Sequence, residues 1–247
     1  MKALSLVIPC YNEALNIPLI AKKCEEMVPE GLNMEIVLVN NGSTDQTADA
    51  IRNVEKKRPD LFVCCHIVKN IGYGHGILTG LKMAKGQVLA WTHADMQTDP
   101  KDVIKAYELY LSQHDQSVLV KGQRTNRAFV PNLFTCGMGI IASMALGEKL
   151  HDIGAQPKLF SKYFYKQHLA NKGPNDFSLD LYAMYCAQKF GSIVTFPVYF
   201  KKRAFGEAKG GGSVKTRLKV TMRVLDFIFK LRKKIKIEKF ARSPQMR

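Results

Sequence analysis

A short apolar run at residues 88–90 leads directly into the segment WTHADMQTDP, residues 91–100. The predicted strand therefore ends in side chains that could hold a charged ligand: His93, Asp95, Gln97 and Asp99. Asp95 and Gln97 are two positions apart, so in an extended loop both side chains can point the same way. An ordinary polar turn that caps the next helix would use the same residue types. These ten residues alone leave both interpretations open.

The residues around this segment predict an α/β domain. Apolar runs predict strands, and runs with helical spacing predict the helices between them. We expect strands at residues 4–10, 34–40, 61–68, 87–91 and 117–122, and helices at 14–27, 43–57, 74–86 and from about Pro100 onwards. Strands that are apolar throughout and alternate with helices indicate a mostly parallel sheet covered on both faces. Ligands bind at the carboxyl ends of such strands, where residues 9–13, 40–43 and 91–100 fall.

The composition fits one large folded domain. The chain has 247 residues, of which 46% are apolar, and this is enough for a substantial core. The six cysteines show no CxxC spacing, and most lie in apolar runs, so we expect reduced thiols in a cytosolic protein. The first ten residues predict a strand rather than a signal peptide.

The positive charge is concentrated at one end of the chain. The formal net charge is +16, and residues 201–247 hold 16 Lys or Arg against three acidic residues. Such a basic segment favours polyanions, either nucleic acid or the anionic cytoplasmic face of a membrane.

Two segments in the second half predict contact with a membrane surface. Residues 128–147 carry no charge but include a proline and two glycines before the last turn. This stretch is too polar and too broken for a spanning helix, so we predict an interfacial or buried helical hairpin over 128–147, within an interfacial helical segment at 128–150. Residues 192–203 predict a late strand, and residues 216–247 predict a basic, partly amphipathic helical extension of a domain that covers residues 1–215.

The sequence lacks two common nucleotide-binding motifs. No GxGxxG, the dinucleotide-binding motif, follows the first strand, and no GxxxxGK[ST], the P-loop motif, occurs. A resemblance to the family 2 glycosyltransferases, which have the GT-A fold, is carried instead by four segments: LVIPCYNEALNI, EIVLVNNGSTDQT, NIGYGHGILTGLKMAKG and HADMQTDP. Three further matches narrow it to dolichyl- or polyprenyl-phosphate glycosyltransferases of the dolichol-phosphate mannose synthase type: HADMQ, KGQR and RAFGEAK. The resemblance covers residues 3–215.

The resemblance implies a role for each matching residue. The metal ligands would be Asp95 and Gln97, binding Mg²⁺ or Mn²⁺ together with donor phosphates. Catalytic roles would fall on Asp95, Arg124 and Asp180. The nucleotide-sugar donor, a GDP- or UDP-sugar, would be bound by Pro9, Tyr11, Glu13, Val39, Asn41, His93, Ala94, Arg124, Arg203 and Lys209. Residues 210–215, GGGSVK, would form a flap over the donor.

The chain departs from the family pattern at two places. His93 stands where the family usually has Asp, which removes one negative charge; histidine can donate a hydrogen bond to a phosphate or a hydroxyl, and it suits Mn²⁺ better than Mg²⁺. Asn40 and Asn41 stand where the family usually has two Asp, so the choice of base becomes uncertain. An Asn-Asn-Gly turn that caps the next helix is an equally good explanation of Asn40.

The acceptor decides whether a catalytic base is needed. A sugar hydroxyl must lose a proton to a base, whereas a phosphate is already ionised at neutral pH. Asp152 and Asp180 are the candidate bases, and either carboxylate could instead neutralise a neighbouring Arg.

We therefore expect an inverting, metal-dependent glycosyltransferase that acts on a polyprenyl phosphate and binds peripherally to the cytoplasmic face of the membrane. One alternative is the same fold acting on a sugar hydroxyl of a cell-surface glycan. A non-catalytic nucleic-acid-binding protein is disfavoured, because the basic end lacks regularly interleaved aromatic residues and the motifs would be unexplained. Association with a second copy or with a membrane protein stays open.

Overall fold

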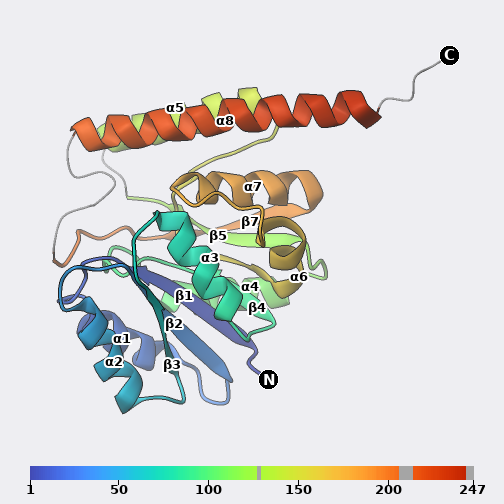
Figure 1. Ribbon diagram of the computed structural model, residues 1–247. Coiled ribbons are helices and arrows are strands. Elements are labelled where there is room, and N and C mark those ends of the chain that lie inside the picture. The colour runs from blue at the N-terminus through green and yellow to red at the C-terminus, as the bar shows by residue number, and fades with distance from the viewer. Residues whose placement is uncertain (127–128, 206–213, 243–247) are drawn as a thin grey trace.

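The computed structural model describes residues 1–126, 129–205 and 214–242. Across these residues the chain forms a seven-stranded sheet with the strand order β3-β2-β1-β4-β6-β5-β7 (Figure 1). The strands are β1 (Leu4–Cys10), β2 (Met34–Asn41), β3 (Phe62–Ile67), β4 (Val88–Trp91), β5 (Val118–Arg124), β6 (Lys158–Ser161) and β7 (Ser192–Val198). All pairings are parallel except the two made by β6, which runs antiparallel to β4 and β5. The predicted mostly parallel sheet is confirmed.

Helices cover both faces of this sheet (Figure 1). They are α1 (Ile17–Met27), α2 (Thr47–Lys57), α3 (Tyr73–Met83), α4 (Lys101–Leu111), α5 (Phe129–Leu146), α6 (Lys162–Phe164), the π-helix η1 (Tyr165–Leu169), α7 (Ser178–Phe190) and α8 (Val214–Arg242). Each strand sends alternate side chains to opposite faces. In β1, Leu4, Leu6 and Ile8 belong to the core shared with α1, α2 and α4, whereas Val7 belongs to the core shared with α3 and α7.

Helices α5 and α8 form a further layer outside α7 (Figure 1). Val224 and Ile228 of α8 are buried in the same core as Ala142 of α5 and the residues of α7. Burying a side chain of this size contributes about 1.5–3 kcal/mol, so α8 is anchored on the domain through one of its faces.

The predicted hairpin over 128–147 is wrong, because the structure has one continuous helix, α5. Contact of the 128–150 segment with a membrane surface stays a prediction. Pro131 falls in the first turn of that helix, where a missing N–H leaves no hydrogen bond unmade. The helix ends before Gly147, whose φ of 75° suits the left-handed conformation of a C-terminal cap. Among the residues described, none of the helices combines the length and the apolar content that crossing a bilayer requires.

Candidate active site

The predicted site residues meet at the carboxyl edge of the sheet, where β2, β1 and β4 end side by side. The register pairs Pro9 with Val39 and Val7 with Trp91, so the segments that follow β1, β2 and β4 emerge next to one another. Val39 itself is fully buried, and its side chain packs near Gly80 of α3. Any contact of Val39 with a ligand would therefore come from its backbone.

Three residues far apart in the sequence form an ion-pair cluster at this edge. Arg203, which lies beyond the end of β7, donates a hydrogen bond from Nη2 to Glu13 Oε1 at 2.9 Å and one to Asp95 Oδ2 at 3.4 Å. All three side chains are largely buried. The second carboxylate oxygen of Glu13 accepts from the side-chain amide of Asn16. The structure therefore brings together the predicted residues Glu13, Asp95 and Arg203.

Asp95 and Gln97 present oxygen atoms next to this cluster. The Gln97 backbone N–H donates to Asp95 Oδ1 at 3.1 Å, around Met96 in a left-handed conformation with φ 61°. Gln97 Nε2 donates to the Lys201 carbonyl at 3.3 Å. The described part of the chain contains no cluster of three or more His, Cys, Asp or Glu that would enclose a metal ion. One carboxylate and one amide oxygen fit an Mg²⁺ or Mn²⁺ ion that takes its remaining ligands from donor phosphates and water.

His93 lies beside this pair and is hydrogen-bonded to a residue that the sequence analysis did not single out. Its Nε2 is 3.0 Å from Tyr73 Oη, and Tyr73 stacks on Phe177 with ring centroids 5.0 Å apart. Burial lowers the pKa of His93 below its usual value, although Asp95 and Asp180 oppose this effect. The imidazole is therefore neutral at neutral pH. The sequence signal for Tyr73 was its place in the GYGHG segment at the start of α3.

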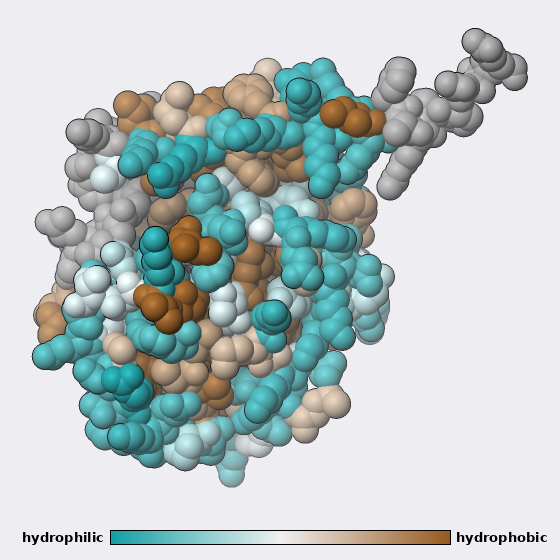
Figure 2. Space-filling view, viewed as in Figure 1, coloured by the Kyte–Doolittle hydropathy of each residue, from teal (hydrophilic) through white to brown (hydrophobic). Residues whose placement is uncertain are grey.

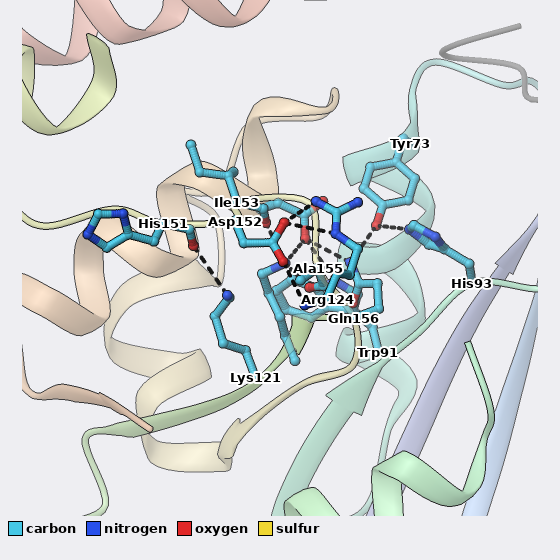
Figure 3. Close-up of polar contacts among 12 residues, drawn as sticks. Tyr73, Trp91, His93, Lys121, Arg124, His151, Asp152, Ile153, Ala155 and Gln156 are labelled. Atoms are coloured by element: carbon cyan, nitrogen blue, oxygen red, sulfur yellow. Dashed lines mark hydrogen bonds and ion pairs between the residues drawn. The ribbon is translucent and has the colours of Figure 1, made fainter. Parts of the chain in front are cut away.

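Arg124 and Asp152 form a buried ion pair (Figure 3). The Arg124 backbone N–H donates to Asp152 Oδ2 at 2.9 Å, and its Nε and Nη2 both donate to Oδ1, the former at 2.8 Å. Burial raises the pKa of Asp152, but the hydrogen bonds and the charge of Arg124 outweigh it, so the pKa lies below the ordinary value. This carboxylate is a weak base.

The Asp180 carboxylate is also hydrogen-bonded to neighbouring side chains. Its Oδ1 accepts from Lys158 Nζ at 2.5 Å, from Gln156 Nε2 at 3.0 Å and from Trp91 Nε1 at 3.3 Å. Lys158 donates further to the carbonyls of Ile153 and Ala155, each at 2.9 Å. Lys158 Nζ thus joins Asp180 to the loop that follows Asp152.

A second buried lysine holds the start of this loop. Lys121 lies opposite Lys158 in the β5–β6 pairing, and its Nζ donates to the His151 carbonyl at 3.2 Å. Burial and the neighbouring Lys158 lower the pKa of Lys121 to about 7. Neither lysine was predicted, because a charged residue inside a short apolar run normally indicates a solvent-facing position.

The two asparagines after β2 make contacts within the protein. Asn40 accepts from the Ser43 backbone N–H at 3.1 Å, and its Nδ2 lies 2.9 Å from His66 Nδ1, so it caps the turn before α2. Asn41 donates to the Gly72 carbonyl at 3.1 Å and packs against Gly76, where a Cβ would lie 2.8 Å from its Nδ2. Contact of Asn41 with a nucleotide base stays a prediction.

Tyr11 is half-buried and Ala94 is buried at the same edge of the sheet. Lys209 and residues 210–213 of the predicted flap lie outside the described residues, and the side chains of the flap's last two residues are likewise not described.

A family model, glycosyl transferase family 2, matches residues 5–167. The dodecaprenyl-phosphate galacturonate synthase of Rhizobium johnstonii is 30% identical over 168 residues, which are 66% of this chain and 49% of that protein. An undecaprenyl-phosphate 4-deoxy-4-formamido-L-arabinose transferase of Pseudomonas aeruginosa is 25% identical over 169 residues, 67% of this chain and 49% of that protein. The chain thus spans about half the length of these relatives.

Solved structures agree with the fold. Glucosyl-3-phosphoglycerate synthase from Mycobacterium tuberculosis, in complex with Mn²⁺, UDP and glucosyl-3-phosphoglycerate, superposes with a TM-score of 0.70 at 14% identity, over 91% of this chain and 77% of that one. The GT-A fold implied by the sequence resemblance is confirmed. With a family model that matches more than half of its residues, the chain belongs to glycosyl transferase family 2.

Proposed function

We propose that this chain is an inverting, metal-dependent glycosyltransferase that moves a sugar from a nucleotide-diphosphate donor to a polyprenyl phosphate. The choice of acceptor rests on one observation: each of the two candidate bases is already ion-paired with a neighbouring cation. Asp152 is held by Arg124, and Asp180 is held by Lys158. A hydroxyl acceptor needs a group that takes its proton, whereas a phosphate acceptor arrives ionised. Both similar relatives described above are polyprenyl-phosphate enzymes by name.

The ion-pair cluster supports binding of the donor diphosphate. A divalent cation held by Asp95 and Gln97 would neutralise the negative charge that develops on the departing diphosphate. Arg203 contributes a guanidinium at the same place, and Arg is suited to bidentate contacts with phosphate oxygens. Glu13 holds that guanidinium at the carboxyl edge of the sheet. The chain therefore supplies positive charge and metal ligands where the donor is predicted to bind.

The outer helix layer supports attachment to the cytoplasmic face of a membrane. Several large apolar side chains are exposed there: Ile140, Ile141 and Met144 on α5, and Leu218, Met222, Phe229 and Ile237 on α8. Basic residues accompany them on α8, and Figure 2 shows hydrophobic and hydrophilic residues mixed along this layer. Each Lys or Arg near an anionic lipid surface contributes about 1 kcal/mol to binding. Exposed apolar residues among basic ones suit lipid better than nucleic acid.

The experiment that tests this proposal is a transfer assay with three acceptors. The full chain is incubated with UDP- and GDP-sugars, with Mg²⁺ or Mn²⁺, and with undecaprenyl phosphate, undecaprenol or a lipopolysaccharide core. We expect cation-dependent transfer to undecaprenyl phosphate alone, and this transfer should survive in Asp180→Asn. Transfer to the glycan that is lost in Asp180→Asn would instead identify a hydroxyl acceptor with Asp180 as its base.

A further inference from the structure

A series of hydrogen bonds connects the buried Lys158 with His93 in the candidate donor site. Figure 3 labels three of its members, Gln156, Tyr73 and His93. Lys158 donates to Asp180 Oδ1, and Gln156 Nε2 donates to the same oxygen at 3.0 Å. Gln156 Nε2 also lies 3.4 Å from Tyr73 Oη, which in turn lies 3.0 Å from His93 Nε2. Gln156 and Tyr73 come from different parts of the chain, and neither was predicted to be a site residue.

The direction of each hydrogen bond in this series, from donor to acceptor, follows from the contacts at its buried end. Asp180 Oδ1 accepts hydrogen bonds from Lys158 Nζ and Trp91 Nε1, so it faces Gln156 as an acceptor. The Gln156 amide must therefore turn its NH₂ group, and not its oxygen, toward Asp180. The second N–H of the same nitrogen then points to Tyr73 Oη as a donor.

The hydroxyl of Tyr73 is the next link. Its oxygen accepts from Gln156, so its single O–H is left to donate. Two acceptors face that O–H, the Asp180 carboxylate and His93 Nε2, and the hydrogen-bond distance of 3.0 Å to Nε2 favours His93. A neutral imidazole that accepts at Nε2 carries its proton on Nδ1. No other hydrogen bond of His93 occurs within the described part of the chain, so Nδ1 keeps its N–H for a ligand.

We infer that Tyr73 and Gln156 are positioning residues that fix the tautomer of His93, so that Nδ1 presents an N–H to an oxygen of the bound donor. The ligand named here rests on the proposed function, whereas the tautomer does not. A carboxylate at position 93 would repel an anionic oxygen, whereas this imidazole donates to it. The oxygen can belong to the donor diphosphate or to its sugar.

Nitrogen-detected imidazole NMR tests the tautomer directly. Two-bond ¹H–¹⁵N correlations of the full chain, without donor, cation or acceptor and at mildly alkaline pH, distinguish protonated from unprotonated ring nitrogens. We expect the Nδ1–H form of His93 in the wild type. Tyr73→Phe keeps the ring that stacks on Phe177 but removes the O–H, so the Nε2–H form should gain about 2- to 10-fold in relative population. Phe177→Leu removes the stacking partner and keeps the hydrogen bond, so it should leave the tautomer unchanged.

Binding experiments then identify the oxygen. Affinities of wild type and Tyr73→Phe are compared for a nucleoside diphosphate and for the corresponding nucleotide sugar, both with Mn²⁺. An equal loss in Tyr73→Phe for both ligands assigns the contact to the diphosphate, and a loss only for the nucleotide sugar assigns it to the sugar. A wild-type His93 in the Nε2–H form would overturn the inference and would mean that Tyr73 donates toward Asp180, whatever the enzyme transfers. A tautomer population of His93 that is unchanged in Tyr73→Phe would also overturn the inference.

Discussion

Arg203 and Asp95 are 108 positions apart, yet the Arg203 guanidinium lies 3.4 Å from the Asp95 carboxylate and 2.9 Å from Glu13. In the proposed enzyme, the carboxylate that would hold the cation is thus neutralised by the arginine that would hold the diphosphate. Both ligands would have to bind within this cluster, so changes to either residue should affect donor and cation together.

Asp95→Ala should lower transfer about 100-fold or more, because a bound cation supplies several kcal/mol of charge stabilisation in the transition state. The fold should persist, since Arg203 keeps its ion pair with Glu13. Transfer rates, Mn²⁺ titrations and thermal melts measure these effects. Asp99→Asn is the matched control in the same segment, because Asp99 caps α4 through the Lys101 backbone N–H. A control that loses as much activity as Asp95→Ala would contradict the metal assignment.

Arg203→Ala should weaken donor binding about 10- to 150-fold, the expected loss for one hydrogen bond to a charged group. It also leaves Glu13 and Asp95 without their shared cation, so the metal-free protein should melt earlier. Added Mn²⁺ should then raise the melting temperature more in this variant than in wild type. Calorimetric titration and melts with and without Mn²⁺ measure both effects, with Lys201→Ala as an exposed control. Normal donor affinity in Arg203→Ala would assign this residue to structure alone.

The contacts of the candidate site could be predicted from the sequence only in part, for physical reasons. Apolar runs that end in polar motifs show where parallel strands end, so the sequence predicts Glu13 and Asp95 at one edge of the sheet. The four-residue strand β6 was missed, because it begins with the fully buried Lys158. The partners of buried charges are long-range, and nothing in local spacing pairs Lys158 with Asp180 or Tyr73 with His93. The hairpin expected over 128–147 from a proline and two glycines is wrong, because Pro131 lies in the first turn of α5 and the glycines do not interrupt that helix.

Asp152→Asn should change the acid stability of the protein. The pKa of Asp152 is lower in the folded chain than the unfolded value of about 3.9, so its ion pair stabilises the fold at every pH above that value. That contribution is lost as the pH falls from about 4 through the lower folded pKa. Melting temperatures measured from neutral to acid pH should therefore fall less steeply in Asp152→Asn. Parallel curves for variant and wild type would show that Arg124 does not stabilise the ionised carboxylate.

Lys121 should give the stability a slope at alkaline pH. Its pKa is about 7 in the folded chain and about 10.4 when unfolded, so between these values the unfolded state binds the extra proton. The free energy of unfolding therefore rises with pH across that interval, and this gain is lost as the pH falls toward 7. Lys121→Met should remove this slope in denaturant melts. Lys189→Met is the control, because it changes an exposed lysine on α7 whose Nζ donates to Tyr185 Oη and lies over the Phe190 ring. A slope that persists in Lys121→Met would contradict the assignment.

Membrane attachment is best tested by substitutions on α8 rather than by deleting it. Removing the chain after Lys215 would uncover the core around Val224 and Ile228, and loss of vesicle binding could then reflect unfolding. Met222 and Phe229 are 59% and 56% exposed, so the double variant Met222→Ser and Phe229→Ser removes apolar surface without opening the core. Transfer of this surface into lipid contributes about 1.5–3 kcal/mol per side chain, so binding to anionic vesicles should weaken by at least about 10-fold.

The control for this variant is Leu111→Ser, which changes a 57% exposed residue at the end of α4, the helix on the opposite face of the sheet. Cosedimentation with anionic and with neutral vesicles measures the binding, and nucleotide-sugar affinity is measured alongside. Only the α8 variant should lose vesicle binding, and its transfer to long-chain polyprenyl phosphate should slow while donor affinity stays at the wild-type value. If the α8 variant sediments with anionic vesicles as the wild type does, this face of the helix is not the membrane contact.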